Sequence, residues 1–512
     1  PERKENIMKH TFRKLASVLT ALCMLVSLFP AALAALPVAY EYVQDTDGVD
    51  SGTVYAIYYG GTSNGSILYH TGSGTTDQVG GTVAGDTLTL NGGFAVSRQL
   101  WTIVSAEGGY TLQSVDSGRY LDLSQPTSSK VNTAQEAVTL TISLLEDGTY
   151  TVTHTSGNAL SHGTSGQYYS SSSATPLYFY KQTEVEPSMA PGAPSGSSAG
   201  QPFVKEDTNS THFRIPALLT LDNGWIAAAS DIRWRTDGDS PQNLDTIVSL
   251  SKDGGATWDW NVVNYYDDMA DDATGQTSAS FIDPSILQAE DGTVHMVVDA
   301  CPSYVGLMYG NQMGWESSGF DDAGRLLVTL GTSGGNASKK VADYTYYADI
   351  NNPSAGAEQV VGGEAITLYP ICKAEDDSQT GAWVDAWLNV YTEEGGVITP
   401  DLCLQLQSSD AVQSNLFYRN SQWKAYPVFY IMHRSADVTA DGLVWSDPQF
   451  LDIKLSEDEA FTGVCPGRGL SFQYEGHERL VFPLYDNATG TELASVIYSD
   501  DGGQTWTRGQ HN

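Results

Sequence analysis

Basic residues are scarce in this 512-residue sequence, where 25 Lys and Arg stand against 61 Asp and Glu for a formal net charge of −36. A surface this acidic repels a polyanion over most of its area, which excludes a protein that binds nucleic acid by neutralising phosphates. Charged residues of both signs make up only 17% of the chain, against 41% hydrophobic residues. The composition is therefore that of a globular protein and not of an acidic disordered tail.

Cysteine is also scarce. The five cysteines are widely spaced and form no CxxC pair, which argues against a structural zinc site and against a disulfide framework. The sequence contains no HExxH, P-loop or Rossmann fingerprint. The segment Gly331–Gly335 matches GxSxG, but no strand-to-helix elbow surrounds it, so we interpret it as a loop. We therefore expect neither a metal ion nor a cofactor.

Long hydrophobic runs are absent except near the N-terminus, where Leu15–Leu33 follows the basic segment Lys9–Lys14. The run ends in the small-x-small pattern Ala32–Ala34, which is typical of a signal-peptide cleavage site. We predict a signal peptide over residues 1–34, with Met8 as the initiator. A membrane anchor is the alternative, but the proline and alanines at the end of the run favour cleavage. The protein is then expected to be secreted or held at the cell surface, without stable membrane insertion.

Glycine and tyrosine are abundant, with 51 and 28 residues, and together they favour tight turns and strands. We therefore expect an all-β chain. Over residues 36–183, short polar-apolar alternations recur with a period of roughly 40 residues. This pattern predicts an accessory β module, either β-trefoil-like or a β-sandwich. It resembles modules appended to secreted glycosidases, so it either binds carbohydrate or serves as a spacer.

The rest of the chain divides at a segment of unusual composition. Residues 184–201 are rich in Pro, Gly and Ser and show no strand pattern, which predicts a semi-extended linker. The β character returns over residues 202–512, which we expect to form one large domain. The stretch from about 332 to 423 breaks the rhythm of that domain, and we interpret it as an insertion folded as a small β lobe.

Two segments, Ser251–Trp258 and Ser499–Trp506, follow one eight-residue template, S-x-D-x-G-x-T-W. The template suits a hairpin turn, because Asp caps turn N–H groups, Gly tolerates a positive φ, and Trp packs where the next strand begins. A third, degenerate copy runs from Ser435 to Trp445. The fixed positions of the two full copies are Ser251, Asp253, Gly255, Thr257, Trp258, Ser499, Asp501, Gly503, Thr505 and Trp506.

This template resembles the Asp boxes of sialidases and of some other β-propellers. Those boxes lie on the outer turns of the blades, so the resemblance by itself implies an architecture and no particular chemistry. A sharper signal is Phe213–Pro216, which reads Phe-Arg-Ile-Pro, a motif that precedes the first Asp box in sialidases; here Ser251 follows Arg214 by 37 positions. The resemblance is to the larger bacterial exo-sialidases with an inserted β lobe, and it implies a six-bladed β-propeller.

The same resemblance assigns roles to two residues. It implies that Arg214 belongs to a triad of arginines that holds the carboxylate of sialic acid. A planar guanidinium binds a carboxylate through two parallel hydrogen bonds, whereas Lys offers only a point charge. It also implies that Asp239, 25 positions further on, is the general acid/base, with Asp237 and Asp245 as rivals. For Arg214 the alternative is an ordinary ion pair at the start of a strand.

Further pocket residues follow from the same resemblance. Arg233 corresponds to a second arginine near the sugar carboxylate. Asp283 corresponds to a residue that contacts a sugar hydroxyl, and Ile282 to one beneath the N-acetyl group. For Arg233 and Asp283, a surface ion pair is the alternative. The nucleophilic Tyr of the family, its Glu partner and the other two triad arginines match no residue here, so we expect them beyond residue 512 and expect the chain as given to be inactive.

The resemblance covers about residues 203–512 and implies an exo-sialidase that cleaves terminal sialic acids from sialylated glycans with retention of configuration. One alternative is a non-catalytic carbohydrate-binding protein that acts through its N-terminal module. Another is an intramolecular trans-sialidase, which the residues of this chain cannot separate from a hydrolase. A third is a propeller with different chemistry, against which Phe-Arg-Ile-Pro and Asp239 both count.

Overall fold

The computed structural model describes residues 38–511 except 61–64, 92–93, 164–165, 186, 269–276, 304, 308–312, 332–334, 407–409, 455–458, 460 and 487–491. Strands dominate the described residues, which confirms the predicted all-β class. The helices among them are at most four residues long, and none is long and apolar enough to cross a membrane. The predicted signal peptide over residues 1–34 lies outside the described residues.

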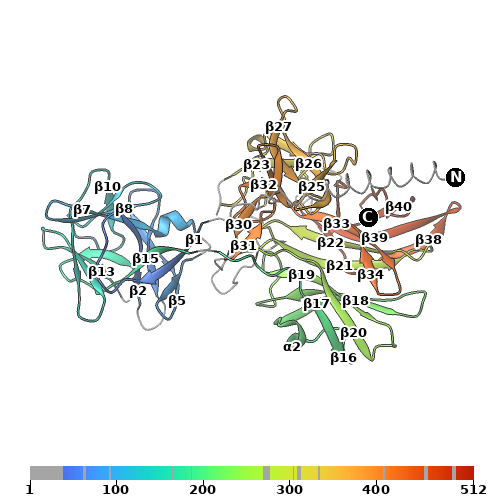
Figure 1. Ribbon diagram of the computed structural model, residues 1–512, viewed down its shortest axis with the longest axis horizontal. Helices are drawn as coiled ribbons and strands as arrows, with labels where there is room; N and C mark the ends of the chain where they lie inside the picture. The colour runs from blue at the N-terminus through green and yellow to red at the C-terminus, as the bar shows by residue number, and fades with distance from the viewer. Residues whose placement is uncertain are drawn as a thin grey trace, which may run out of the picture.

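Residues 38–185 form a separate module at one end of the molecule (Figure 1). It contains an eleven-stranded and a four-stranded antiparallel sheet. The last strand, β15 (Tyr178–Val185), closes the module by pairing with both β1 (Ala39–Gln44) and β2 (Thr53–Tyr59). In its interior two tyrosine hydroxyls donate hydrogen bonds to the buried carboxylate of Asp45. The module therefore has a core of its own.

The predicted linker over residues 184–201 is only partly free of regular structure. β16 (Ser195–Ala199) pairs antiparallel with β20 (Thr257–Asn264) and forms the outer edge of the next sheet. The composition of β16 has a packing reason, because a Cβ at Gly196 would lie 2.6 Å from the ring of Trp260. A glycine that indicates a flexible linker in the sequence is thus needed for close contact between two strands.

Three mainly antiparallel sheets form the large domain outside the inserted lobe. The first has the strand order β16-β20-β19-β18-β17, the second contains β34-β33-β22-β21, and the third contains β36-β39-β40-β41. Consecutive strands are neighbours in most of these sheets, which is the pattern of propeller blades. Their strands are β17 (His212–Thr220), β18 (Ile226–Arg233), β19 (Leu244–Ser251), β21 (Ser280–Gln288), β22 (Val294–Cys301), β33 (Tyr430–Val438), β34 (Leu443–Trp445), β36 (Thr462–Val464), β38 (Leu470–Tyr474), β39 (His477–Asp486), β40 (Leu493–Ser499) and β41 (Thr507–Arg508).

The inner strands of the three sheets meet at the centre of this domain. β21 pairs in parallel with the short β37 (Gly467–Arg468), and β17 lies against both of them. The three sheets therefore lie next to one another, with β17, β21 and β36 on the sides that meet. This arrangement is of the β-propeller type, as predicted. The number of six blades remains a prediction.

A separate lobe is inserted into the second sheet, between the end of β22 at Cys301 and the start of β33 at Tyr430. The lobe extends beyond the predicted bounds of 332–423 on both sides. The difference arises at β23 (Leu326–Leu330), an apolar run that reads in the sequence like the next strand of the large domain. In the structure β23 pairs with β24 (Tyr346–Ala348) and β32 (Trp423–Ala425) within the lobe.

Two inner strands are kinked where they carry predicted site residues. In β17 a bulge follows Arg214, and Ile215 has a φ of 59°. In β21 a bulge follows Ile282, and Asp283 has a φ of 65°. Each residue with positive φ precedes a proline, which has no N–H for the strand ladder and restricts the residue before it. The bulges re-aim the side chains that flank them, as bulges near functional sites commonly do.

The two template segments form the same turn. Asp253 accepts hydrogen bonds from the N–H and hydroxyl of Thr257 at 2.9 and 2.7 Å, and Asp501 accepts the same pair from Thr505 at 2.9 and 2.6 Å. These bonds lower the pKa of Asp253 to about 2. The first turn begins at Ser251, at the far end of β19 from the predicted site residues. Both segments therefore hold hairpin ends together.

Candidate active site

Arg214 lies at the bulge in β17, where its side chain is 44% exposed. Its Nη1 donates to Oδ1 of Asp239 at 3.0 Å and to the backbone carbonyl of Asp237 at 3.0 Å. The structure therefore brings together the predicted carboxylate-binding arginine and the predicted acid. Their contact joins the start of β17 to the loop between β18 and β19.

Arg233, at the end of β18, contacts the same carboxylate from the protein interior, since its side chain is 0% exposed. Its Nη1 lies 2.8 Å from Oδ1 of Asp239 and also donates to the carbonyls of Asp237 and Gly238 at 2.6 and 2.7 Å. Its Nη2 donates to Oδ2 of Asp231 at 2.8 Å. The surface ion pair considered for Arg233 does not occur, since the guanidinium is buried and fastens the loop that carries Asp239.

The loop that carries Asp239 is held by contacts of the residues that follow it, while the Asp239 side chain itself is 54% exposed. The hydroxyls of Ser240 and Ser280 lie 2.8 Å apart, and the N–H of Ser278 donates to the carbonyl of Pro241 at 2.8 Å. Gly306 packs so closely that a Cβ there would lie 2.0 Å from the Ser240 carbonyl oxygen. An exposed carboxylate on an anchored loop suits a group that must meet a substrate in a fixed position.

The two rival acids occupy different environments. Asp245 is fully buried, where it accepts hydrogen bonds from the Trp234 indole at 2.7 Å and from the N–H of Tyr266 at 2.8 Å. Burial raises the pKa of Asp245 to about 8. Asp237 is exposed, and its contacts with the two arginines use its backbone carbonyl. Of the three acids, Asp239 is the one whose carboxylate meets both guanidinium groups, and its role as the acid remains a prediction.

Asp283 lies beside this group at the bulge in β21. Burial raises the pKa of Asp283 to about 6 and the nearby Asp239 adds to the rise, while Arg233 and Arg214 oppose it. The backbone N–H of Asp283 donates to Asp231, which also bonds to Arg233, so Asp283 belongs to the same group of residues. The neighbouring Ile282 is 6% exposed and belongs to the main hydrophobic core. The roles predicted for Asp283 and Ile282 toward a sugar remain predictions.

Two buried acids near the site carry no motif and escape sequence reasoning. Asp231, in β18, bonds to Arg233 and accepts the N–H of Asp283 at 3.0 Å. Asp299, in β22, accepts the N–H of Val464 at 3.0 and 3.2 Å. Burial raises the pKa of both acids, to about 8 for Asp231, where Arg233 opposes the rise. In the sequence, the only sign of these two residues is that each is a single acid within an apolar strand. A buried acid of this kind needs a hydrogen-bonding or charged partner.

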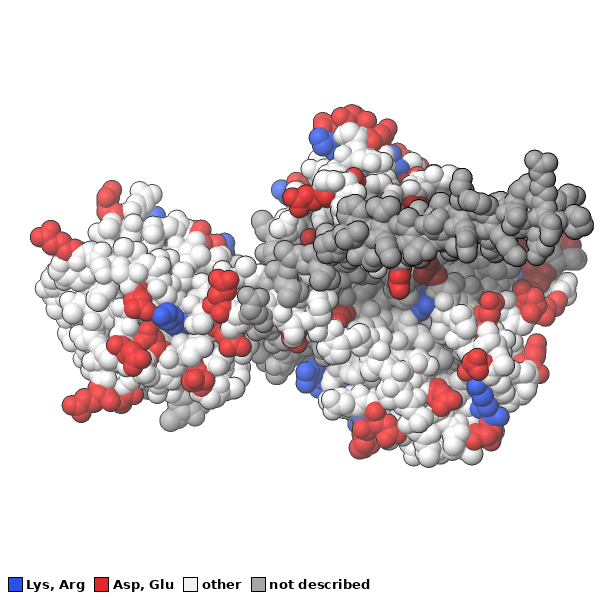
Figure 2. Space-filling model, viewed as in Figure 1, with Lys and Arg blue, Asp and Glu red and all other residues white. Residues whose placement is uncertain are grey.

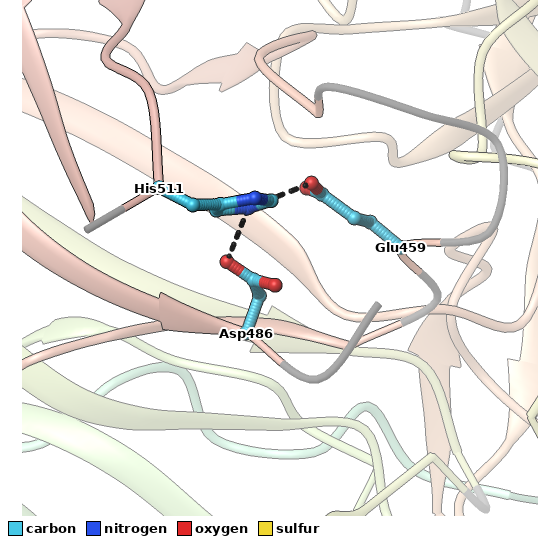
Figure 3. A group of neighbouring side chains, drawn as sticks. All are labelled: Glu459, Asp486 and His511. Atoms are coloured by element: carbon cyan, nitrogen blue, oxygen red, sulfur yellow. Dashed lines mark ion pairs between the residues drawn. The ribbon is translucent and has the colours of Figure 1, made fainter. Parts of the chain in front are cut away.

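A second polar cluster lies at the end of the third sheet (Figure 3). Nε2 of His511 is 2.9 Å from Asp486 and 3.4 Å from Glu459, an arrangement that could hold a metal ion. However, Arg508 already lies 2.8 Å from Asp486 and 3.5 Å from Glu459. The guanidinium pairs with both buried carboxylates, so the cluster is an ion-pair network that ties β41 to the sheet.

The charge of the surface sets the electrostatic background of the site. Figure 2 shows Asp and Glu side chains spread over the visible face, with few Lys and Arg among them. At the candidate site two guanidinium groups meet three carboxyl groups, from Asp231, Asp239 and Asp283. An anionic ligand would therefore depend on direct contact with an arginine and would gain little from the overall field of the molecule.

Comparison with known proteins gives no matching family model, but it gives clear relatives. The chain is 30% identical over 329 residues to an anhydrosialidase of Macrobdella decora, covering 60% of this chain and 39% of that protein. It is 26% identical over 326 residues to sialidase B of Streptococcus pneumoniae, covering 59% and 42%. Among solved structures, the intramolecular trans-sialidase of Ruminococcus gnavus matches with a TM-score of 0.48 at 26% identity, covering 60% of this chain and 62% of that one.

In sequence the chain is therefore similar to sialidases, over 329 residues of the first relative and 326 of the second. The similarity includes a bacterial sialidase, as the sequence motifs predict. The chain spans 39% and 42% of the lengths of the two curated relatives.

Proposed function

We propose that the whole protein is a secreted exo-α-sialidase and that this chain contributes part of its active site. The observation that supports this most strongly is the convergence of Arg214 and Arg233 on one oxygen of Asp239, in a chain similar in sequence to sialidases. The proposed substrates are sialylated glycans, whose terminal sugar carries a permanent carboxylate. Arginine is the residue best suited to grip such a group.

The exposure of the two arginines suggests different tasks. Arg214 is exposed enough to meet a substrate, so in the proposal its guanidinium receives the sugar carboxylate. Arg233 is buried and binds the backbone of the Asp239 loop, so it holds the proton donor in place. This division modifies the expectation that Arg233 lines the pocket directly. Asp283 would face a sugar hydroxyl, with Ile282 beneath the N-acetyl group.

The chemistry proposed for Asp239 is general acid/base catalysis. It would protonate the departing glycosidic oxygen and later remove a proton from the attacking water. The resemblance to sialidases implies a Tyr nucleophile, and a neutral phenol suits this substrate because the sugar carboxylate beside the anomeric carbon repels an anionic nucleophile. We assign no residue of this chain to the nucleophile, to its Glu partner or to the remaining arginines.

Two other functions stay open. An intramolecular trans-sialidase would release an anhydro sugar where a hydrolase releases free sialic acid, so analysis of the product by mass spectrometry separates them. A non-catalytic carbohydrate-binding protein would act through the N-terminal module. Binding of glycans by residues 36–183, without sialoside cleavage by the full-length protein, would favour that reading over the sialidase proposal.

The experiment that tests the sialidase proposal compares two loop variants of the full-length protein on a fluorogenic α-sialoside. Asp239→Asn should lower kcat by about 100-fold or more, the usual contribution of a general acid, with KM changed little. Asp237→Asn is the matched control, since it keeps the backbone carbonyl that the arginines bind. A wild-type protein without activity, or an Asp239→Asn variant as fast as Asp237→Asn, would contradict the proposal.

A further inference from the structure

Asp231 occupies an unusual place among the polar groups of the large domain. It lies in β18 directly opposite Arg214 of β17, and its side chain is 0% exposed. Oδ2 accepts a hydrogen bond from Arg233 at 2.8 Å, and Oδ1 accepts the backbone N–H of Asp283 at 3.0 Å. Both oxygens therefore face N–H donors, and the two donors come from different sheets.

This arrangement links the candidate site residues in one continuous chain of contacts. Asp231 holds the N–H of Asp283 in the second sheet and the guanidinium of Arg233 in the first. Arg233 in turn holds Asp239, which contacts Arg214. Asp231 is thus the link between the two sheets in this series of contacts, and it is fully buried.

The contact with Asp231 also stabilises the backbone of Asp283. Asp283 has a φ of 65°, a conformation that costs a residue other than glycine free energy and persists where the surroundings enforce it. The N–H at such a bulge lacks its regular ladder partner. Asp231 supplies that partner from the neighbouring sheet, and so it fixes the backbone that presents the Asp283 carboxyl group.

The same device occurs one sheet further on. Asp299 lies in β22 opposite Ile282, as Asp231 lies opposite Arg214 in β18. It reaches across to the third sheet and accepts the N–H of Val464, two residues before Pro466. Asp299 thus joins two sheets as Asp231 does, but its contacts do not include Arg233. Asp299 can therefore serve as a control for Asp231, because it joins two sheets without contacting Arg233.

We propose that Asp231 is a positioning residue that sets the geometry of Arg233, Asp239 and Asp283 as a unit. The proposal rests on the proposed sialidase function for the site itself. Asp231→Asn keeps nearly the same shape, but its amide must place an NH₂ group against either the guanidinium of Arg233 or the N–H of Asp283. Arg233 then loses its second carboxylate partner and is drawn more strongly to Asp239.

The test compares pH–rate profiles of the full-length wild type, Asp231→Asn and Asp299→Asn on a fluorogenic α-sialoside. Asp231→Asn should lower kcat by at least about tenfold and move the alkaline limb of the profile, because the guanidinium of Arg233 that contacts the proposed acid is repositioned. Asp299→Asn should leave the position of that limb unchanged, although it removes a similar bond between sheets. A purely structural role for Asp231 would lower activity without moving the limb.

The outcomes distinguish the two proposals. An inactive wild type contradicts the proposed function, whereas an active wild type with identical limbs in wild type and Asp231→Asn contradicts the positioning role alone. If Asp231→Asn does not fold, hydrogen–deuterium exchange of the wild type decides. The amide of Asp283 should then exchange slowly, since its N–H is donated to a buried carboxyl group. Fast exchange at Asp283 inside a protected β21 would overturn the proposal.

Discussion

Two histidines form a titratable pair inside the second sheet. Nδ1 of His295, in β22, lies 3.0 Å from Nε2 of His433, in β33, and the rings are stacked with an interplanar angle of 14°. The indole of Trp506, from the second template segment, packs against His433. Burial lowers the pKa of both histidines, to about 3 for His433, where the neighbouring His295 adds to the effect.

This pair predicts a loss of stability in mild acid. A folded pKa below the unfolded value of about 6.5 means that stability is complete above that pH and falls as the pH drops through it. His433 alone should cost up to about 1.4 kcal/mol of unfolding free energy for each pH unit below about 6.5. In urea unfolding between pH 7 and pH 5, His433→Gln should therefore show a shallower pH dependence than the wild type. Equal slopes for the two proteins would contradict the prediction.

Arg214 and Asp239 show how much a motif reveals about single residues. The Phe-Arg-Ile-Pro motif pointed to Arg214, and the spacing of 25 residues to an acidic loop pointed to Asp239. In the structure Nη1 of Arg214 lies 3.0 Å from Oδ1 of Asp239. The burial of Arg233 could not be foreseen, since it depends on the loop that folds over it. The role of Asp231 could not be predicted either, because its second partner, the N–H of Asp283, comes from another sheet.

At the scale of the element, β16 and β23 mark where sequence patterns mislead. β16 has a linker composition, yet it pairs with β20 because Gly196 lets Trp260 approach. β23 has the apolar run of a blade strand, yet it belongs to the inserted lobe. In both cases the partner strand decides the outcome, and that partner is distant in the sequence. The template turns were predictable because their hydrogen bonds are local.

The last strand, β41, is fastened by one buried ion-pair network. Arg508 is 3% exposed, lies 2.8 Å from Asp486 and 3.5 Å from Glu459, and donates through Nε to Ser495 at 3.0 Å. Desolvation lowers the pKa of Arg508, and the two carboxylates oppose that effect. Removal of the guanidinium would take the arginine away from two buried acids and leave only His511 beside them.

Arg508→Met should therefore destabilise the folded chain by about 3–5 kcal/mol, the usual cost of breaking a buried ion pair. The measurement is urea unfolding at neutral pH. Adding Asp486→Asn and Glu459→Gln to Arg508→Met should recover part of the loss, since the stranded charges are then gone. Arg479→Met is the matched control, because Arg479 pairs with Asp500 at the surface. A loss no larger than that of the control would show that the network contributes little.

At the scale of the whole molecule, the architecture could be predicted further than the site could. The N-terminal module has a core of its own, whereas the large domain and the inserted lobe share one core. The site is harder to predict, since Arg214, Asp239 and Asp283 come from three segments that meet only when two sheets pack together. A sequence motif indicates each of these residues by itself, whereas the packing of the sheets determines which of them lie next to one another.

The proposed function requires that Arg214 recognise a sugar carboxylate. The most direct measurement is calorimetric binding of 2-deoxy-2,3-didehydro-N-acetylneuraminic acid and of its uncharged carboxamide to the full-length protein and to Arg214→Lys. The wild type should bind the acid at least about tenfold more tightly than the amide, because a hydrogen bond to a charged group contributes about 1.5–3 kcal/mol. Arg214→Lys should lose most of that preference, while Arg479→Lys, distant from the site, should keep it. Equal binding of acid and amide by the wild type, or an undiminished preference in Arg214→Lys, would contradict the proposed function.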